Sequence, residues 1–131
     1  MAQCTTIVVI EDEERIRKVL DYNLKLDGFE VFPARDGPEG LELARDKKPD
    51  LILLDWMMPG MDGLQVLSEL KEDEKTRDIP VFMLTAKSMM TEVGRALYQG
   101  ADDYIVKPFE PRELGQMLKE KLEKAVQTKP Q

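Results

Sequence analysis

Leu51-Ile52-Leu53-Leu54-Asp55-Trp56-Met57-Met58-Pro59-Gly60 is the stretch of sequence that decides the fold. Four apolar residues lead directly into one carboxylate, and Pro59-Gly60 then predicts a turn. An apolar run of this length is typical of a strand that is buried on both faces of a parallel sheet. Asp55 is therefore expected at the carboxyl end of such a strand. Open α/β sheets bind their ligands at this edge.

Four more apolar or β-branched runs predict strands at residues 5–10, 29–34, 81–84 and 101–106. Apolar residues at helical spacing follow every strand, and one of these helices is expected from about Ser88 to Gln99. Five strand and helix pairs in succession predict a parallel sheet with helices on both faces.

Three residues predict local details of this arrangement. Asp12 is well placed to cap the start of the first helix with its carboxylate. Pro33 lacks the N–H group that an inner strand donates, so the strand at residues 29–34 is expected at an edge of the sheet. Pro38 suits the first position of the second helix.

Composition excludes several classes of function. The chain has 131 residues, enough for one domain, and its 26 acidic and 19 basic side chains give a net charge of -7. This charge disfavours nucleic acid as a direct partner and favours a divalent cation or a basic protein surface. Cys4 is the only cysteine, so an internal disulfide is impossible and a reducing compartment is expected. Histidine is absent, which excludes His-based zinc sites and Ser-His-Asp triads.

Polar residues stand at the ends of four predicted strands. They are Glu11 with Asp12, then Asp55, Thr85 and Lys107. In a doubly wound sheet these strand ends share one edge, so the side chains are expected to converge. Clustered carboxylates repel one another unless a cation lies among them, and Mg²⁺ prefers oxygen ligands. The set predicts a phosphoryl-transfer site in which Asp55 is the nucleophile, while the metal and Lys107 neutralise the transferring group.

Each of these residues also has an ordinary structural interpretation. Acidic residues are common at helix starts, Thr85 suits a strand end, and a single lysine is usually a solvated surface charge. Trp56 and Tyr104 suit core and half-buried positions. The functional interpretation depends on the coincidence of all the polar residues at strand ends.

Four stretches of the sequence resemble the receiver domain of bacterial two-component response regulators. They are Val9-Ile10-Glu11-Asp12-Glu13, Leu54-Asp55-Trp56-Met57-Met58-Pro59-Gly60-Met61-Asp62-Gly63, Met83-Leu84-Thr85-Ala86-Lys87, and Gly100-Ala101-Asp102-Asp103-Tyr104 with Lys107-Pro108-Phe109. The resemblance covers roughly residues 5–126 and is greatest to receivers attached to winged-helix transcription factors. It implies a single receiver domain over residues 1–131, with 127–131 as a short tail. It also implies a flavodoxin-like, three-layer α/β/α fold with five parallel strands in the order 2-1-3-4-5.

The resemblance assigns roles to the residues that match. Asp55 corresponds to the phosphoacceptor and Lys107 to the lysine that binds the phosphoryl group. Thr85 corresponds to the switch hydroxyl and Tyr104 to the switch aromatic. The Lys107-Pro108 peptide bond is expected to be cis.

The metal site follows from the same resemblance. Asp12 corresponds to the direct ligand of Mg²⁺, for which Mn²⁺ is an alternative, and Asp55 is expected to be a further ligand. Glu11 would act through a water molecule, and Met57 would offer its backbone carbonyl.

As a receiver, the chain is expected to accept a phosphoryl group from a sensor histidine kinase or a phosphotransfer protein. A surface made by the fourth helix, fifth strand and fifth helix would then control a downstream protein or an output domain, with Met89, Met90 and Leu97 as candidate contacts. Beyond its own phosphoryl transfer and slow autodephosphorylation the chain is not an enzyme. The chain is expected in the cytoplasm, without membrane or direct nucleic-acid contacts. It is expected to be a monomer when unphosphorylated, and the phosphorylated form could dimerise.

One departure from the winged-helix subgroup bears on oligomerisation. Activated receivers of that subgroup pair through charged residues that include arginines, and Val93 and Met117 stand where arginine is expected. Asp103, Glu113 and Lys119 of that set are present. The incomplete set, together with an end just after the last helix, favours a stand-alone receiver.

Three other functions compete with this interpretation. A haloacid-dehalogenase-like phosphatase needs an aspartate two residues after the nucleophile, but Met57 stands there and cannot move protons. A flavin or nucleotide binder needs a glycine-rich turn after the first strand, where this chain has four acids. A degenerate receiver that serves only as a scaffold would not need Asp55 and Lys107.

Overall fold

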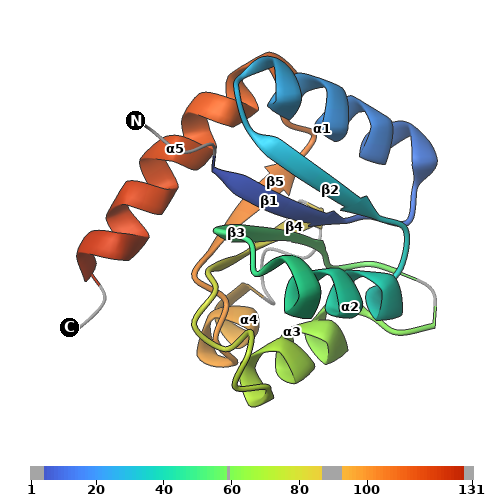
Figure 1. The fold of residues 1–131 in the computed structure, drawn as a ribbon, viewed down its shortest axis with the longest axis vertical. Coiled ribbons are helices and arrows are strands. Elements are labelled where there is room, and N and C mark those ends of the chain that lie inside the picture. Colours follow the sequence, from blue (N-terminus) through green and yellow to red (C-terminus); the bar gives the residue numbers. More distant parts are fainter. Residues whose placement is uncertain (1–4, 59, 87–92, 129–131) are drawn as a thin grey trace.

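Five parallel strands form one sheet at the centre of the molecule (Figure 1). The structure is a computed structural model that describes residues 5–58, 60–86 and 93–128. The strands lie in the order β2-β1-β3-β4-β5, which confirms the predicted topology. Their bounds are β1 Thr6–Ile10, β2 Glu30–Ala34, β3 Leu51–Asp55, β4 Val81–Ala86 and β5 Asp103–Lys107.

Helices cover both faces of the sheet (Figure 1). Their bounds are α1 Glu14–Leu26, α2 Gly37–Lys47, α3 Gly63–Glu72, α4 Val93–Tyr98 and α5 Pro111–Thr128. Helices α1 and α5 pack on one face, and α2, α3 and α4 pack on the other. The result is the predicted three-layer α/β/α fold. None of the described helices is long and apolar enough to span a bilayer.

Alternate residues of each strand enter opposite layers of the core. In β3, Leu51 and Leu53 face α1 and α5, whereas Ile52 and Leu54 face α2 and α3. All five residues of this strand are buried. The apolar run therefore behaves as a strand covered on both sides, and it carries Asp55 to the carboxyl edge of the sheet.

The predicted local details have mixed outcomes. Pro33 lies on β2, which is an edge strand, as predicted. The prediction that Asp12 caps α1 is wrong: Glu13 is the N-cap residue, and no side chain caps it. Pro38 is the second residue of α2 rather than the first.

Two element boundaries also differ from the sequence prediction. The last strand begins at Asp103 and ends at Lys107, rather than spanning residues 101–106. The reason is that Asp102 joins the loop to β4, where its carboxylate accepts the N–H of Val81 at 2.9 Å. The start of the helix predicted from Ser88, with Met89 and Met90, lies outside the described residues. Leu97 is exposed, as predicted for a surface contact.

Candidate functional site

Three carboxylates meet at the carboxyl edge of the sheet. Glu11 directly follows β1, Asp12 is the next residue, and Asp55 ends β3. Each offers an oxygen to a group whose atoms lie within 4.8 Å of one another. Glu11 and Asp55 are buried, at 0% and 3% exposure, whereas Asp12 is exposed. The predicted convergence of these three side chains at one edge of the sheet is therefore confirmed.

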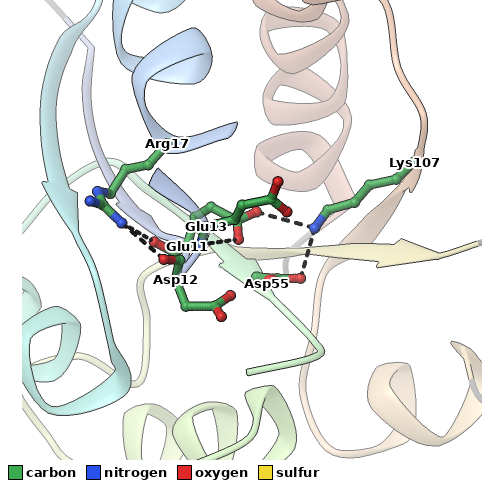
Figure 2. A network of polar contacts seen from close by, with 6 residues as sticks. All are labelled: Glu11, Asp12, Glu13, Arg17, Asp55 and Lys107. Carbon is green, nitrogen blue, oxygen red and sulfur yellow. Dashed lines mark hydrogen bonds and ion pairs between the residues drawn. The ribbon is translucent and has the colours of Figure 1, made fainter. Parts of the chain in front are cut away.

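Lys107 binds two of the carboxylates from the far side of β4 (Figure 2). Its Nζ lies 3.0 Å from Oδ1 of Asp55 and 3.1 Å from Oε1 of Glu11. Because β4 separates β3 from β5, the backbones of Asp55 and Lys107 lie two inter-strand spacings apart, or roughly 10 Å. The long lysine stem and the shorter aspartate side chain reach toward each other across β4 and meet in the ion pair. The Lys107-Pro108 bond that follows is cis, as the family resemblance implied.

The loop after β1 is held by contacts that the sequence did not predict. The N–H of Glu13 donates to Oε2 of Glu11 at 3.1 Å. Nη1 of Arg17 donates to the backbone carbonyls of Glu11, at 2.9 Å, and of Asp12, at 3.3 Å (Figure 2). The sequence spacing could have predicted these contacts. Arg17 lies one helical turn after Glu13, and helical side chains point back toward the start of their helix, here toward this loop.

The burial of this cluster changes its acid–base behaviour. Burial, with the neighbouring charge of Asp55, raises the pKa of Glu11 to about 7. Burial also raises the pKa of Asp55, although Lys107 opposes that rise. For Lys107, burial lowers the pKa, but the attraction of Asp55 and Glu11 is larger and the pKa is raised overall. The carboxylates are thus short of positive charge, while the lysine stays protonated.

These residues fit a divalent cation such as Mg²⁺. The donors are all carboxylate oxygens, the ligand type that Mg²⁺ prefers, and among the three carboxylates the ammonium group of Lys107 binds only those of Glu11 and Asp55. Burial and the neighbouring Asp55 carboxylate raise the pKa of Glu11, and a divalent cation beside these groups would oppose that rise. The side chain of Met57 is 61% exposed and offers no oxygen, so the ligand role predicted for Met57 would belong to its backbone carbonyl.

Gly63 allows helix α3 to begin directly against the end of β3. Its N–H donates to the carbonyl oxygen of Trp56 at 2.8 Å. A Cβ atom at this position would lie 2.7 Å from the carbonyl oxygen of Asp55 and 2.7 Å from Cα of Trp56. The indole of Trp56 itself is buried in the core under this loop. In the sequence Gly63 is only one residue of a matching motif, and the close approach to the backbone of Asp55 and Trp56 that requires glycine could not be predicted.

The two predicted switch residues lie on β4 and β5. Thr85 is buried, and its hydroxyl donates to the carbonyl of Ala86 at 3.3 Å. Tyr104 is half-buried, with Nζ of Lys121 at 6.0 Å from the centre of its ring. Lys121 also pairs with Asp103 at 3.0 Å. Among the contacts of the described residues, none joins the Thr85 hydroxyl to Asp55 or to Tyr104.

An apolar groove opens beside Lys107. Its volume is about 490 Å³, and its walls come from the start of α1 and from the loop between β5 and α5. Val19 on its α1 wall is 40% exposed. The lining residues are Glu13, Arg15, Ile16, Val19, Lys107, Pro108, Phe109 and Pro111.

The raised pKa of Glu11 predicts how stability depends on pH. In metal-free protein, the free energy of unfolding should fall as the pH rises from about 4.5 to about 7. In this window the unfolded chain has already released the Glu11 proton, whereas the folded chain still holds it, so deprotonation favours unfolding. Asp55 contributes in the same direction. Urea unfolding at several pH values would measure the slope. Glu11→Gln should flatten it, and an equal slope in that variant would contradict this cause.

The chain resembles known proteins in sequence and in structure. The family model of the response regulator receiver domain matches residues 7–119. The phosphate regulon transcriptional regulatory protein PhoB of Pseudomonas aeruginosa is 46% identical over 114 residues, which cover 87% of this chain and 50% of that protein. PhoB of Escherichia coli is 47% identical over 108 residues, 82% of this chain and 47% of that protein. The chain thus spans about half the length of these relatives.

Solved structures agree with the sequence matches. The chemotaxis protein CheY4 of Vibrio cholerae has a TM-score of 0.84 at 28% identity, covering 90% of this chain and 98% of that one. The receiver domain of NtrX from Brucella abortus has a TM-score of 0.81 at 32% identity, covering 89% and 98%. Both similarities extend over nearly the whole fold.

Proposed function

Because this chain belongs to the response regulator receiver domain family, we propose that it is a switch controlled by phosphorylation of Asp55. The observation that carries the proposal is the ammonium group of Lys107 between Asp55 and Glu11, with Asp12 beside them. A transferring phosphoryl group requires a carboxylate nucleophile with positive charge beside it, and Lys107 supplies one such charge.

The residues divide the work of phosphoryl transfer. A carboxylate oxygen of Asp55 would attack phosphorus, and the bond from phosphorus to the donor's imidazole nitrogen would break. Lys107, already 3.0 Å from Oδ1 of Asp55, would bind an oxygen of the incoming group. Mg²⁺, held by Asp12, Asp55 and the Met57 carbonyl and through water by Glu11, would supply the remaining positive charge; Mn²⁺ has suitable chemistry as well.

The direct test is incorporation of phosphate from acetyl phosphate. Intact-mass spectrometry should show one added phosphoryl group per chain, and only when Mg²⁺ is present. Phosphorylation without Mg²⁺ would contradict the metal role, and no phosphorylation under any condition would contradict the proposal as a whole.

The natural donor would be a phosphohistidine on a sensor kinase or phosphotransfer protein. Asp55 is only 3% exposed, so the donor protein must sit closely on the surface around the site. The groove beside Lys107 supplies an apolar surface there, while Met57, at 61% exposure, supplies another next to Asp55. Exposed apolar side chains beside a buried reactive group favour a protein partner.

Val19→Glu should therefore affect phosphoryl transfer from a protein donor but not from the small donor acetyl phosphate. A charge in the groove would oppose docking of a protein, so transfer from the cognate phosphohistidine protein should slow by about tenfold or more, a typical loss for an apolar interface contact. Labelling by acetyl phosphate should be unchanged, because Val19 takes no part in the hydrogen bonds and ion pairs that join Asp55, Glu11 and Lys107. Tyr22→Glu, on an exposed position outside the groove, is the matched control. Equal slowing with both donors would mean that Val19→Glu disturbs the phosphoryl-transfer site around Asp55, and it would contradict a role of the groove in docking.

The signal would leave through Thr85, Tyr104 and the surface of α4, β5 and α5. Phosphorylation adds roughly 1.5 to 2 negative charges and new acceptor oxygens at Asp55. The buried Thr85 hydroxyl now donates only to the carbonyl of its neighbour, at the long distance of 3.3 Å. It can exchange that bond for one to the phosphoryl oxygens, and Tyr104 would occupy the space it leaves. A downstream protein or output domain would read the changed surface.

Thr85→Ala should uncouple phosphorylation from this response. The variant should still accept phosphate, because Asp55, Lys107 and the metal ligands are unchanged. Hydrogen exchange of residues 93–119, measured with and without beryllofluoride, should then change far less than in the wild type. Thr85→Ser, which keeps the hydroxyl, should respond normally. A full response in Thr85→Ala would rule out the proposed route.

Oligomerisation is expected to be weak in the resting state. Asp103 is already paired with Lys121 within the chain, and Met117 packs against the core under α5. The ammonium group of Lys119 lies against the ring of Phe29. The side chain of Val93 lies outside the described residues. We propose a monomeric receiver before phosphorylation, with dimerisation open to the phosphorylated form.

A further inference from the structure

We propose that Arg17 is a positioning residue for the metal site: its guanidinium group holds the backbone of Glu11 and Asp12 so that both carboxylates face Asp55. This inference rests on the proposed Mg²⁺ site and adds a residue that contacts neither the metal nor phosphate. Figure 2 shows Arg17 on the opposite side of Glu11 and Asp12 from Lys107.

The contacts of Arg17 define this role. Nη1 donates to the carbonyl oxygen of Glu11 at 2.9 Å and to that of Asp12 at 3.3 Å. The backbone N–H of Arg17 donates to the carbonyl of Glu13 at 2.9 Å. The side chain of Arg17 therefore binds the carbonyls of Glu11 and Asp12, whereas its backbone N–H makes the ordinary helical bond to the carbonyl of Glu13.

Two adjacent carboxylates need such a restraint to point the same way. In an extended chain, successive side chains and successive carbonyls point to opposite sides. Here the carbonyls of Glu11 and Asp12 share one donor atom, so the backbone must turn at this point. The turn brings the oxygens of both side chains into one group with Asp55. Without Arg17, the extended arrangement would direct one of the two away.

The rest of Glu11 is held independently, which isolates what Arg17 contributes. Its N–H donates to the carbonyl of Ala34 at 3.0 Å, and its carboxylate binds Lys107 and the N–H of Glu13. Asp12 is exposed, and α1 has no side-chain cap that would fix the loop instead. Loss of Arg17 should therefore disorder Asp12 more than Glu11, and the metal should be bound less tightly while the fold persists.

Mg²⁺ titrations of the full chain test this role. Isothermal titration calorimetry would give the affinity for wild type, Arg17→Met, Arg17→Lys and the control Arg15→Met. Arg15 is an exposed arginine on the same turn of α1, so its loss removes the same charge without touching the loop carbonyls. Residues that orient metal ligands typically contribute about 10- to 100-fold to affinity, so Arg17→Met should bind Mg²⁺ at least about tenfold more weakly. Arg17→Lys keeps the charge but not the forked geometry, so its Mg²⁺ affinity should lie between those of wild type and Arg17→Met.

Two further measurements distinguish positioning from general stability. Urea unfolding without metal reports the fold, and the backbone amide signals of residues 11–13 report the loop during the titration. We expect Arg17→Met to bind Mg²⁺ more weakly than wild type under conditions where the variant is fully folded. Its amide signals of residues 11–13 should differ from those of wild type before Mg²⁺ is added.

The measurements distinguish a failure of the role proposed for Arg17 from a failure of the proposed metal site. Equal Mg²⁺ affinity in wild type and Arg17→Met would overturn the inference, whether or not the variant is less stable. An equal loss in Arg15→Met would also overturn it, because charge alone would then explain the effect. If wild type itself binds no Mg²⁺, the proposed metal site fails and this inference fails with it.

Discussion

Asp55→Asn should abolish phosphorylation by acetyl phosphate completely. Asparagine keeps the shape of the side chain but lacks the carboxylate that attacks phosphorus. Glu11, the other buried carboxylate that Lys107 binds, is proposed as a metal ligand acting through water and not as the nucleophile. Intact-mass spectrometry should show only the unmodified chain. The same variant should be more stable than wild type without metal, because it removes one of three crowded acidic groups.

Asp50→Asn is the matched control for this result. Asp50 stands at the other end of β3, where its carboxylate accepts the N–H of Thr6 at 2.8 Å, far from the site edge. That variant should be phosphorylated at the wild-type rate. Normal phosphorylation of Asp55→Asn would place the phosphoacceptor on another residue, and peptide mapping would identify it.

Lys107→Met should have two effects of opposite sign. Phosphoryl transfer should slow by about 10²- to 10³-fold, the usual loss when one donor to a developing charge is removed. Mg²⁺ affinity should rise, because the ammonium group that competes for oxygens of Asp55 and Glu11 is gone. Methionine keeps most of the stem, so packing changes little. Stopped-flow transfer from a small phosphodonor would measure the first effect, and calorimetry the second.

Lys121→Met tests whether the loss of any partly buried lysine ion pair would give the same result. Lys121 is exposed to a similar degree, 26% against 23% for Lys107, and pairs with Asp103 at the same distance of 3.0 Å. It lies on α5, away from the carboxylates. The control should leave transfer and Mg²⁺ affinity unchanged. Weaker Mg²⁺ binding in Lys107→Met would mean that the lysine helps to build the metal site rather than competing with the metal.

The sequence predicted those features that depend on the order of elements along the chain. The alternation of strands and helices determines which strand ends share an edge, so Glu11, Asp55 and Lys107 could be brought together from their positions alone. The same argument placed Thr85 and Tyr104 on neighbouring strands. Pro33 predicted the edge strand because its missing N–H is a property of the residue itself.

Features that depend on the path of a loop could not be predicted in this way. Asp12 was expected to cap α1 because its type and position suit a cap, but the turn held by Arg17 directs its carboxylate to Asp55 instead. Gly63 could be understood only once α3 was seen to start against the carbonyl of Asp55. The start of β5 moved to Asp103 because Asp102 bonds to Val81, a contact between segments far apart in sequence.

The position of Lys107 also determines when this site can exist during synthesis. The lysine is 96 residues from Glu11 and 52 from Asp55, and it reaches them only after β5 has paired with β4. Contacts between such distant residues form late, because a long loop must close first. A nascent chain that has emerged as far as β4 carries the acidic residues without their lysine. We therefore expect full competence for the proposed phosphorylation to be acquired with the last strand, so partly synthesised chains should accept phosphate far more slowly than the complete domain.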